Sequence, residues 1–410
     1  MLSELIKESK YTMFPDLSYV LHYFFGTQPD NVFSIVKTFG LLLVITILTG
    51  ALIVMKELQR KEKEGLIKPI KIKVVEGKPA SPMELFLNGL LGFFLGFKFL
   101  YIFFNFADFQ FDPAEVILSL KGNWLGGIVG GVVFAGLKFY EKKKDQLPKP
   151  RVREVSVSPY ERIGDLTMLA ALGGIVGAKV FALLEDVDLL FAGERTMQDM
   201  VDSFFSGAGM AIYGGLIGGF IACYIYLKRK KIPPIHALDC AAPALMVGYG
   251  IGRLGCQFSG DGDWGIANTN PKPDWMSFLP DWLWVQTYPH NVINGGSNPH
   301  ITIPDCTYRY CTELSPGVYP TSVYEFIVAM ILGGILWSLR KRINIPGMLF
   351  FIYLIMNGFE RFWIEKIRVN EDYIVPILKV KSTQAEFIAV CMMIIGVVGA
   401  LIVWRKRKAV

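Results

Sequence analysis

Apolar runs of about 20 residues alternate with short, strongly charged segments along most of the chain. A helix of about 20 apolar residues crosses the hydrocarbon core of a lipid bilayer. Of the 410 residues, 52% are hydrophobic and 19% are charged, whereas a soluble domain carries about a quarter charged residues. We therefore predict an all-α, polytopic integral membrane protein in which residues 1–410 form a single membrane domain.

The apolar runs predict about nine transmembrane helices. They cover residues 34–55, 83–104, 123–140, 164–184, 207–227, 236–253, 321–339, 346–365 and 385–404.

Lysine and arginine residues are concentrated in alternate loops between these spans. With nine spans, the loops and tail on one side hold 27 of them and those on the other side hold 10. Basic loops stay in the cytoplasm, so we predict an N-terminus outside and a C-terminus in the cytoplasm. This orientation also explains the net charge of +6, and we expect no nucleic-acid partner.

Two successive helical hairpins, residues 83–145 and 164–231, resemble each other. The first helix of each carries glycines and one lysine, Lys98 or Lys179, and an acidic exterior loop follows. The second helices contain WLGGIVGG and YGGLIGGF and exit into lysine-rich loops. Small residues recur wherever membrane helices pack closely, but the matching lysines and loop charges favour a duplication.

The exterior segment 254–320 is long and contains four of the eight tryptophans. Tryptophan is enriched at the membrane–water interface, so we predict a folded exterior (periplasmic) loop or cap, or a substrate-facing arm, rather than a disordered linker. Cys306 and Cys311 lie in this loop, where a disulfide can persist. Two free thiols are the alternative.

Several charged residues fall inside or at the ends of the predicted spans. Each costs roughly 2.5–3.5 kcal/mol to insert, and such residues usually have a function. Arg253, Glu325 and Glu365 are predicted near the exterior ends of their helices. Arg361 is predicted about one turn deeper than Glu365 and on the same helical face. Ion pairs that lock the helices together are one explanation, but convergence at one membrane depth favours a site. Two arginines suit a phosphate, because each guanidinium group can donate two parallel hydrogen bonds to phosphate oxygens.

Seven glycines between Gly248 and Gly265 surround Arg253 and precede or flank Asp261 and Asp263. Glycine-rich backbone that leaves a helix lets amide groups approach an anion closely. The combination of glycines and arginine predicts an anion site at the end of the sixth span.

Four segments, together with a short match in the first span, resemble the prolipoprotein diacylglyceryl transferase family of bacterial inner membranes. The stretch from Gly252 to Gly265 is similar to the family's G-R-x-G-N-F-x-N-x-E-x-W-G, with one extra residue and with Cys256 where the family usually has asparagine. Tyr213-Gly214-Gly215-Leu216-Ile217-Gly218 resembles the family's H-G-G-L-I-G, with tyrosine in place of histidine.

The remaining matches lie in the first span and the last third of the chain. They are Phe39-Gly40 for the family's Tyr-Gly, Pro320, Tyr324 and Glu325 for H-P-S-Q-L-Y-E, and Gly358, Arg361, Glu365 and Arg368 for G-x-x-R-x-x-x-E-x-x-R. The extra hairpin and the long exterior loop depart from the seven-span form usual in the family.

The resemblance implies a transferase that moves the diacylglyceryl group of phosphatidylglycerol to the lipobox cysteine thiol of a prolipoprotein. A thioether forms and glycerol phosphate leaves. The implied location is the bacterial inner membrane, with the active site toward the periplasm, and no metal or other cofactor is expected. The implied catalytic residues are Tyr213, Arg253, Arg361 and Glu365. The implied substrate-binding residues are Arg253, Gly214, Gly215, Asp261, Glu325, Tyr324 and Arg368.

The identity of the base that deprotonates the thiol stays open at this point. The family's histidine would be the natural base, whereas a tyrosine hydroxyl, as in Tyr213, is a poor one at neutral pH. Glu325, Glu365 or Asp261 are alternatives, as is a thiolate stabilised by the arginines.

Two other functions are alternative interpretations of the same sequence. A transporter fits the many spans, but transporter repeats usually have inverted topology, and these two hairpins are parallel. A catalytically degenerate relative that serves as a lipid-binding or secretory-machinery scaffold fits the changes at Tyr213 and Phe39.

Overall fold

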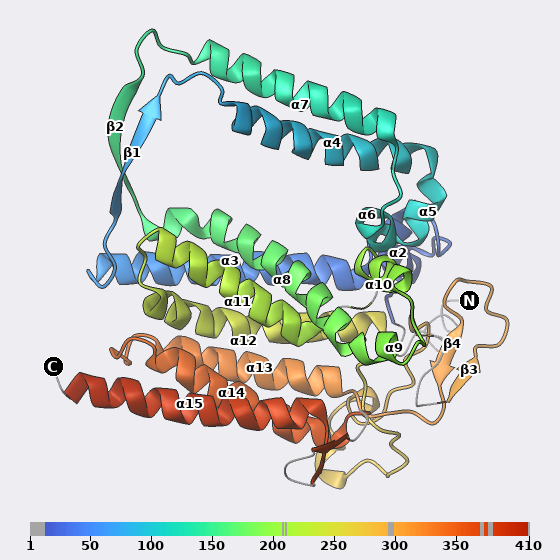
Figure 1. The fold of residues 1–410 in the computed structure, drawn as a ribbon. Helices are drawn as coiled ribbons and strands as arrows, with labels where there is room; N and C mark the ends of the chain where they lie inside the picture. Colours follow the sequence, from blue (N-terminus) through green and yellow to red (C-terminus); the bar gives the residue numbers. More distant parts are fainter. Residues whose placement is uncertain are drawn as a thin grey trace. The chain divides into compact units, whose positions relative to one another are not determined.

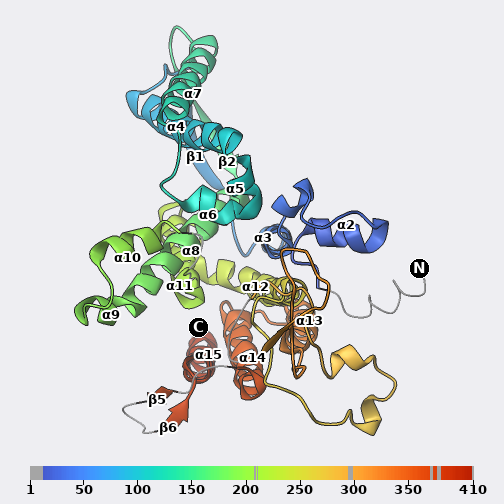
Figure 2. The same cartoon turned by 90° about the vertical axis from the view of Figure 1, so that its right-hand side faces the viewer.

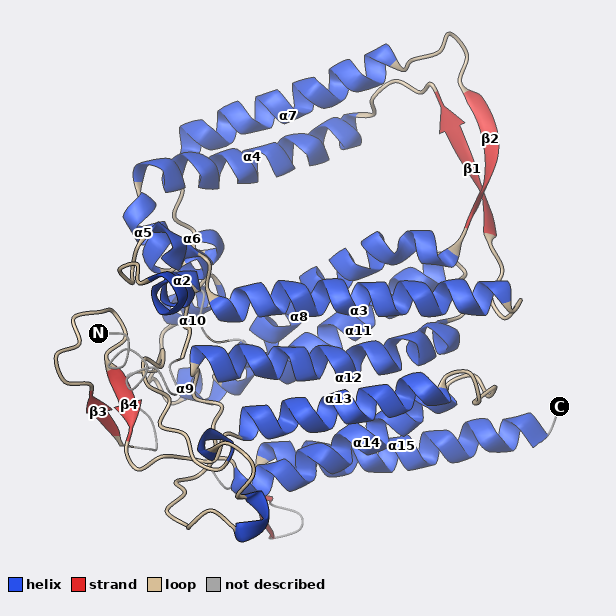
Figure 3. Ribbon diagram, turned by 180° about the vertical axis from the view of Figure 1, so that it is seen from behind, coloured by secondary structure: helices blue, strands red, loops and turns tan. Residues whose placement is uncertain are grey.

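The computed structural model describes residues 13–206, 209, 211–293, 299–369, 373–375 and 380–408. The chain is divided into two compact units, one formed by residues 1–60 and 233–410 and the other by residues 61–232. Each unit is described by itself. In the described residues of both, helices dominate and the strands form short two-stranded ribbons (Figure 3).

The first unit contains five long helices with shorter elements between them. The long helices are α3 (Thr38–Lys63, whose last three residues belong to the other unit), α12 (Pro234–Ser259), α13 (Thr321–Leu339), α14 (Met348–Ile364) and α15 (Gln384–Lys408). The shorter elements are α2 (Leu17–Phe25), η1 (Val32–Ile35), η3 (Asp274–Met276), η4 (Asp281–Leu283), β3 (His300–Thr302), β4 (Thr312–Leu314), η5 (Glu365–Ile367), β5 (Tyr373–Val375) and β6 (Val380–Ser382).

The second unit consists of two helical hairpins and an antiparallel ribbon. Its elements are β1 (Ile70–Glu76), α4 (Pro82–Phe104), α5 (Phe106–Phe111), α6 (Pro113–Leu118), α7 (Trp124–Lys144), β2 (Arg151–Val157), η2 (Pro159–Arg162), α8 (Ile163–Glu185), α9 (Val187–Phe191), α10 (Met197–Phe204) and α11 (Ile212–Arg229). Strands β1 and β2 pair from Ile70 with Val157 to Glu76 with Arg151, so the ribbon joins the two ends of the α4–α7 hairpin (Figure 1).

Six helical segments in the described part of the chain are long and apolar enough to cross a membrane. They are Thr38–Lys63, Pro82–Phe104, Pro159–Glu185, Pro234–Ser259, Thr321–Leu339 and Gln384–Arg407. Large apolar side chains such as Phe94, Phe103 and Leu125 are exposed on the hairpins, as expected for surfaces that face lipid. The all-α polytopic class is therefore confirmed. Helices α7, α11 and α14 coincide with the other three predicted spans, and the count of nine and the orientation stay predictions.

Glycine pairs bring the two helices of each hairpin together. A Cβ atom on Gly96 would collide with the carbonyl of Gly126, and one on Gly130 with the carbonyl of Gly92. In the second hairpin, Gly173 and Gly177 of α8 face Gly214 and Gly218 of α11 in the same way. Small residues spaced by four let membrane helices approach closely, and they explain this packing.

The core of the first unit lies where α12, α13 and α14 meet. Its buried residues are Ala242, Met246, Ala329, Leu336 and Leu349. Helix α13 packs mainly on α12, and α14 mainly on α15, as the view in Figure 2 shows.

Helix α12 extends beyond the predicted span 236–253. It ends at Ser259, with Gly260 in the left-handed conformation and the Gly260 N–H bonded to the carbonyl of Cys256. Arg253 therefore lies inside the helix rather than at its end. The loop that is predicted to be exterior, called the exterior loop below, begins at residue 260. Residues 254–259, which were expected in the exterior segment, are helical, and within the same helix Gly250 packs against Ala329 and Met330 of α13.

The described residues of the exterior loop, 260–293 and 299–320, fold around their own core. Trp264, Tyr288, Leu314 and Val318 are buried together with Met13. Cys306 and Cys311 form a disulfide, which settles the choice between a disulfide and two free thiols.

Candidate functional site

Charged side chains from three neighbouring helices and one loop meet in the first unit. Arg253 comes from α12, Glu325 from α13, and Arg361 from α14, while Glu365 starts η5 directly after α14. Glu325 and Glu365 are fully buried. The structure thus brings together the four residues whose position in apolar spans marked them in the sequence.

Glu325 lies at the centre of this cluster. Its Oε2 lies 3.1 Å from Arg253 Nε and 3.7 Å from Arg361 Nη1, and its Oε1 lies 3.1 Å from Arg368 Nη1. The hydroxyl of Tyr249 also donates to Oε2. A buried carboxylate is costly unless it is paired and hydrogen-bonded, and Glu325 meets both conditions.

Arg253 and Arg368 are both held by carboxylates. Each donates a short hydrogen bond to the carboxylate of Asp263, and each also contacts Glu325. The guanidinium of Arg253 also lies over the ring of Tyr249, 5.3 Å from its centroid. These two arginines are largely occupied by partners within the protein.

Arg361 is placed differently. Its Nη2 lies 3.2 Å from Glu365 Oε2, one helical turn along the chain, as the spacing of four predicted. Its Nη1 makes no hydrogen bond in the described part of the chain. Glu365 is anchored on its other side by Thr383, whose hydroxyl donates to Oε1 at 2.8 Å. Arg368 Nε likewise makes no hydrogen bond in the described residues, but Arg368 is held by Asp263 and Glu325 and is only 7% exposed. Arg361, at 19% exposure, is therefore the more accessible arginine with a donor left for a ligand.

A close backbone contact positions Asp263 and Arg368 beside each other. The segment after α12 runs against the segment after α14, with the Ile266 N–H bonded to the carbonyl of Ile367 at 2.9 Å. A Cβ atom on Gly265 would lie only 2.6 Å from that carbonyl, so only glycine fits there. Ser322 at the start of α13 donates to the Asp263 carbonyl at 2.8 Å and fixes the loop.

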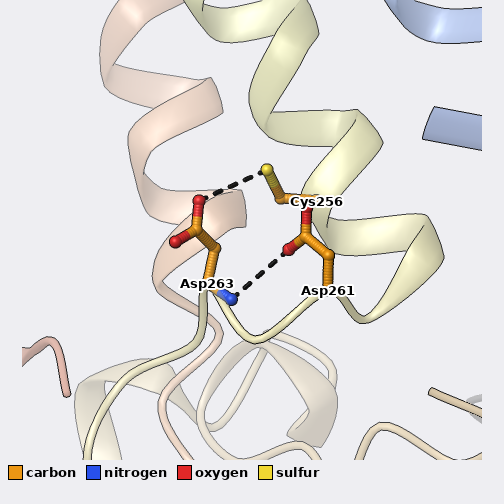
Figure 4. A group of neighbouring side chains, drawn as sticks. All are labelled: Cys256, Asp261 and Asp263. Atoms are coloured by element: carbon orange, nitrogen blue, oxygen red, sulfur yellow. Dashed lines mark hydrogen bonds between the residues drawn. The ribbon is translucent and has the colours of Figure 1, made fainter. Parts of the chain in front are cut away.

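Cys256, Asp261 and Asp263 form a small group at the end of α12 (Figure 4). Their ligand atoms lie within 4.8 Å of one another, and the Cys256 thiol donates to Asp263 Oδ2 at 3.4 Å. The two guanidinium groups on Asp263 would repel a cation. The donor set therefore fits the ion-pair network better than a metal ion.

The two aspartates of this group have opposite pKa shifts. Burial raises the pKa of Asp261, and the nearby carboxylate of Asp263 raises it further. Burial also acts to raise the pKa of Asp263, but the charges of Arg253 and Arg368 outweigh it and hold that pKa well below the ordinary aspartate value. Asp263 is thus an anion that the arginines neutralise.

The remaining predicted site residues lie around or apart from this cluster. Tyr324, one residue before Glu325, donates its hydroxyl to the carbonyl of Leu283 at 2.5 Å and so ties α13 to the exterior loop. Tyr213, Gly214 and Gly215 belong to the second unit, at the start of α11. The packing of Gly214 against α8 is a sufficient reason for glycine there, and a role for these three residues in substrate binding stays a prediction.

Two residues of the cluster region were missed by reasoning from the sequence. Tyr249 lies one turn before Arg253 on α12, so the spacing of four residues could have indicated a shared face. Glu360 is buried next to Arg361, and its Oε1 lies 3.5 Å from the Tyr249 hydroxyl. Glu360 is also a charged residue in a predicted span, and this signal could have indicated it. Asp263 was noted only as a neighbour of Arg253, and its central position was not predicted.

Comparison with known proteins links the sequence to one family. Residues 146–403 match the family model described as prolipoprotein diacylglyceryl transferase. A phosphatidylglycerol–prolipoprotein diacylglyceryl transferase of Leptospira interrogans is 27% identical over 230 residues, which is 50% of this chain and 61% of the relative.

Two further relatives carry the same name. The protein of Lysinibacillus sphaericus is 30% identical over 201 residues, 49% of this chain and 62% of its own length. The protein of Prochlorococcus marinus is 27% identical over 312 residues, 70% of this chain and 91% of its own length. The chain thus spans about three-fifths of the Leptospira and Lysinibacillus proteins. The matched part includes α8, α11 and the whole arginine–carboxylate cluster, whereas α4 to α7 lie before it.

Proposed function

The chain belongs to the prolipoprotein diacylglyceryl transferase family, and on that premise we propose that it transfers the diacylglyceryl group of phosphatidylglycerol to a cysteine thiol. The acceptor is the lipobox cysteine of a prolipoprotein signal peptide. The thiol sulfur forms a bond with the glyceryl carbon, the bond between that carbon and the phosphate oxygen breaks, and glycerol phosphate leaves.

The observation that carries this proposal is the state of Arg361. Its guanidinium lies in a buried cluster of charges, yet Nη1 has no hydrogen-bond acceptor in the described part of the chain. A phosphodiester brought to this point would supply the missing acceptor. Guanidinium binds phosphate oxygens through two parallel hydrogen bonds, and in a site that excludes water such bonds stabilise the charge that develops on the leaving phosphate.

The other residues of the cluster support Arg361 in this scheme. Arg253 and Arg368 add positive charge beside the phosphate, while Glu325 and Asp263 hold both arginines in place. Glu365 orients Arg361 through their ion pair. Asp261 and Tyr324 lie at the edge of the cluster and are proposed to contact the substrates, and Tyr213 is proposed to contribute its hydroxyl from the second unit.

We place the reaction at the periplasmic side of the bacterial inner membrane. The basic loops support this orientation, because it puts the start of the loop after α12, and with it Asp261 and Asp263, outside. A secreted lipobox cysteine and the headgroup of a phospholipid would meet at this level.

A transfer assay with purified protein tests the proposal. The protein is incubated with phosphatidylglycerol and a synthetic lipobox peptide, and the peptide is analysed by mass spectrometry. We expect a peptide that carries one diacylglyceryl group on its cysteine, and none on a matched peptide with serine in that position. A folded protein that binds phosphatidylglycerol but leaves the cysteine peptide unmodified would contradict the proposal and favour the lipid-binding scaffold.

A further inference from the structure

An apolar pocket of about 590 Å³ lies between α13 and α14. Val328 and Leu332 of α13 and Met356, Phe359 and Trp363 of α14 line it, and Glu360 is the acidic residue in its wall. The arginine–carboxylate cluster uses the adjacent residues of the same two helices. Glu360, whose Oε1 lies 3.5 Å from the Tyr249 hydroxyl, therefore links the pocket to the cluster.

Glu360 is the carboxylate that no arginine occupies. Its side chain is buried, its Oε2 has no hydrogen-bond partner, and it forms no ion pair in the described part of the chain. By contrast, Glu325, Glu365 and Asp263 each contact one or more guanidinium groups. A carboxylate whose lone pairs are free can accept a proton from a substrate, whereas one filled by arginine donors is poorly placed to do so.

We propose that Glu360 accepts the proton of the acceptor thiol, and that the pocket between α13 and α14 binds the apolar peptide segment that carries this thiol. The inference rests on the proposed function and names the base that the sequence left open.

The charges of Glu360 and Arg361 favour different positions for the two substrates. A phosphate would be repelled by Glu360 and attracted by Arg361, the next residue on α14. A neutral thiol has the opposite preference, because a carboxylate can take its proton, and apolar pocket walls suit an apolar peptide segment. The acceptor thiol therefore fits the pocket, and the phospholipid headgroup fits the arginines.

The hydroxyl of Tyr249 can relay the proton from Glu360. This hydroxyl donates to Glu325 and lies 3.5 Å from Glu360 Oε1, so its oxygen can accept from Glu360 once Glu360 is protonated. The proton moves from sulfur to Glu360, and the Tyr249 hydroxyl can pass it on toward the leaving phosphate. Sulfur gains the bond to carbon, the electron pair of the broken carbon–oxygen bond stays on the phosphate oxygen, and that oxygen finally takes the proton.

Replacement of Glu360 by glutamine keeps the shape and removes the base. At pH 7 we expect Glu360→Gln to lower the transfer rate by about 10²-fold or more. A cysteine thiol ionises by itself with a pKa of about 8.5, so the deficit should shrink as the pH is raised to about 9.5. Glu360→Asp should retain part of the rate, and Glu141→Gln, an exposed carboxylate on α7, should behave like the wild type.

A second variant tests the pocket. Val328→Trp fills it from α13 and should raise the KM for the lipobox peptide while leaving the KM for phosphatidylglycerol near the wild-type value. A rise in the KM for phosphatidylglycerol alone would overturn the assignment of the pocket to the peptide.

The outcomes separate this inference from the proposed function. A wild-type rate in Glu360→Gln, or a deficit of equal size at pH 7 and 9.5, overturns the role of Glu360 while transfer by the wild type still stands. If the wild-type protein itself forms no thioether, the proposed function fails and the inference fails with it.

Discussion

Arg361 keeps 19% of its side chain exposed, whereas Arg253 and Arg368 keep 9% and 7%. The two more buried arginines are engaged by Asp263 and Glu325. A phosphate can reach Arg361 without breaking these pairs, so the three arginines have unequal tasks. We propose that Arg361 contacts the donor phosphate and that the other two arginines set the local charge.

Arg361→Lys therefore tests the phosphate contact. Lysine keeps the charge but loses the planar pair of donors, and we expect a loss of about 10²-fold in transfer rate with normal expression. Arg253→Lys should also lower the rate sharply, because Asp263 and Glu325 would lose a shared partner. Wild-type rates in both variants, measured by mass spectrometry of the peptide, would remove the phosphate-binding argument.

Tyr213→Phe tests the second unit. If the hydroxyl takes part in proton transfer or binds the phosphate, its loss should cost about 10²-fold in rate with little effect on stability, since only one oxygen is removed. If the Tyr213 ring only packs against its neighbours, Tyr213→Phe should leave the transfer rate nearly unchanged and Tyr213→Ala should lower it. Near-normal turnover of Tyr213→Phe would leave proton transfer to the carboxylates of the first unit.

The sequence allowed the prediction of those site residues whose charge conflicts with their surroundings. Arg253, Glu325 and Arg361 are conspicuous because charges are rare in apolar spans. Tyr249 is an ordinary residue in such a span, and only the fold shows that its hydroxyl contacts Glu325. The same holds for the contact of Asp263 with Arg368, which lies 105 residues away.

At the level of helices, the two hairpins of the second unit share more than their glycines. The Asn123 N–H bonds to the Phe97 carbonyl at 2.9 Å, and at the matching positions the Ala211 N–H bonds to the Ala178 carbonyl at 3.2 Å. We propose on this basis that one hairpin is a copy of the other.

The next residue after each of these carbonyls is a buried lysine. Lys98 donates to the Val116 carbonyl at 2.7 Å, and Lys179 donates to the Ser203 carbonyl at 3.0 Å. Both lysines thus bind carbonyl groups of the segment that links the two helices of their hairpin. This structural task accounts for charged residues inside the spans.

The glycines of the two hairpins allow a matched test. Gly96→Leu and Gly177→Leu should each separate a helix pair, because each Cβ would meet a facing glycine backbone. We expect Gly177→Leu to lower the transfer rate strongly and Gly96→Leu to lower it less, because only α8–α11 lies in the matched family region. When the glycine pairs are aligned, Leu125 of the first hairpin corresponds to Tyr213, so that hairpin lacks the hydroxyl.

Gly136→Leu and Gly164→Leu are the controls, since a Cβ at either position meets nothing within 4 Å. If Gly96→Leu and Gly177→Leu express and transfer as well as these controls, close glycine packing does not hold the hairpins together.

Helix ends were less predictable than helix positions. Predicted span 321–339 matches α13 residue for residue, because Pro320 and a change to polar residues mark its ends. Helix α12 extends six residues beyond its predicted end at Arg253. The glycine-rich stretch indicated backbone that leaves the helix after Arg253, but residues 254–259 stay helical, and Gly255 packs against Phe39 and Leu42 of α3. Local propensity was overridden by helix packing.

For the whole molecule, the uneven distribution of lysine and arginine predicts the orientation in the membrane. Single cysteines in a cysteine-free variant, treated with an impermeant reagent in intact cells, test it. We expect labelling at a site in residues 266–293 and none at position 144, at the end of α7. The reverse pattern would overturn the predicted topology and, with it, the periplasmic position of the site.

The central claim is that one protein couples cleavage of phosphatidylglycerol to thioether formation. The most direct measurement follows both products in one reaction, with glycerol phosphate and diacylglyceryl peptide quantified over time for the purified protein. We expect equal amounts of the two products at every time point, with both amounts reduced together in Arg361→Lys. Glycerol phosphate released without modified peptide, or neither product from a folded protein, would contradict it.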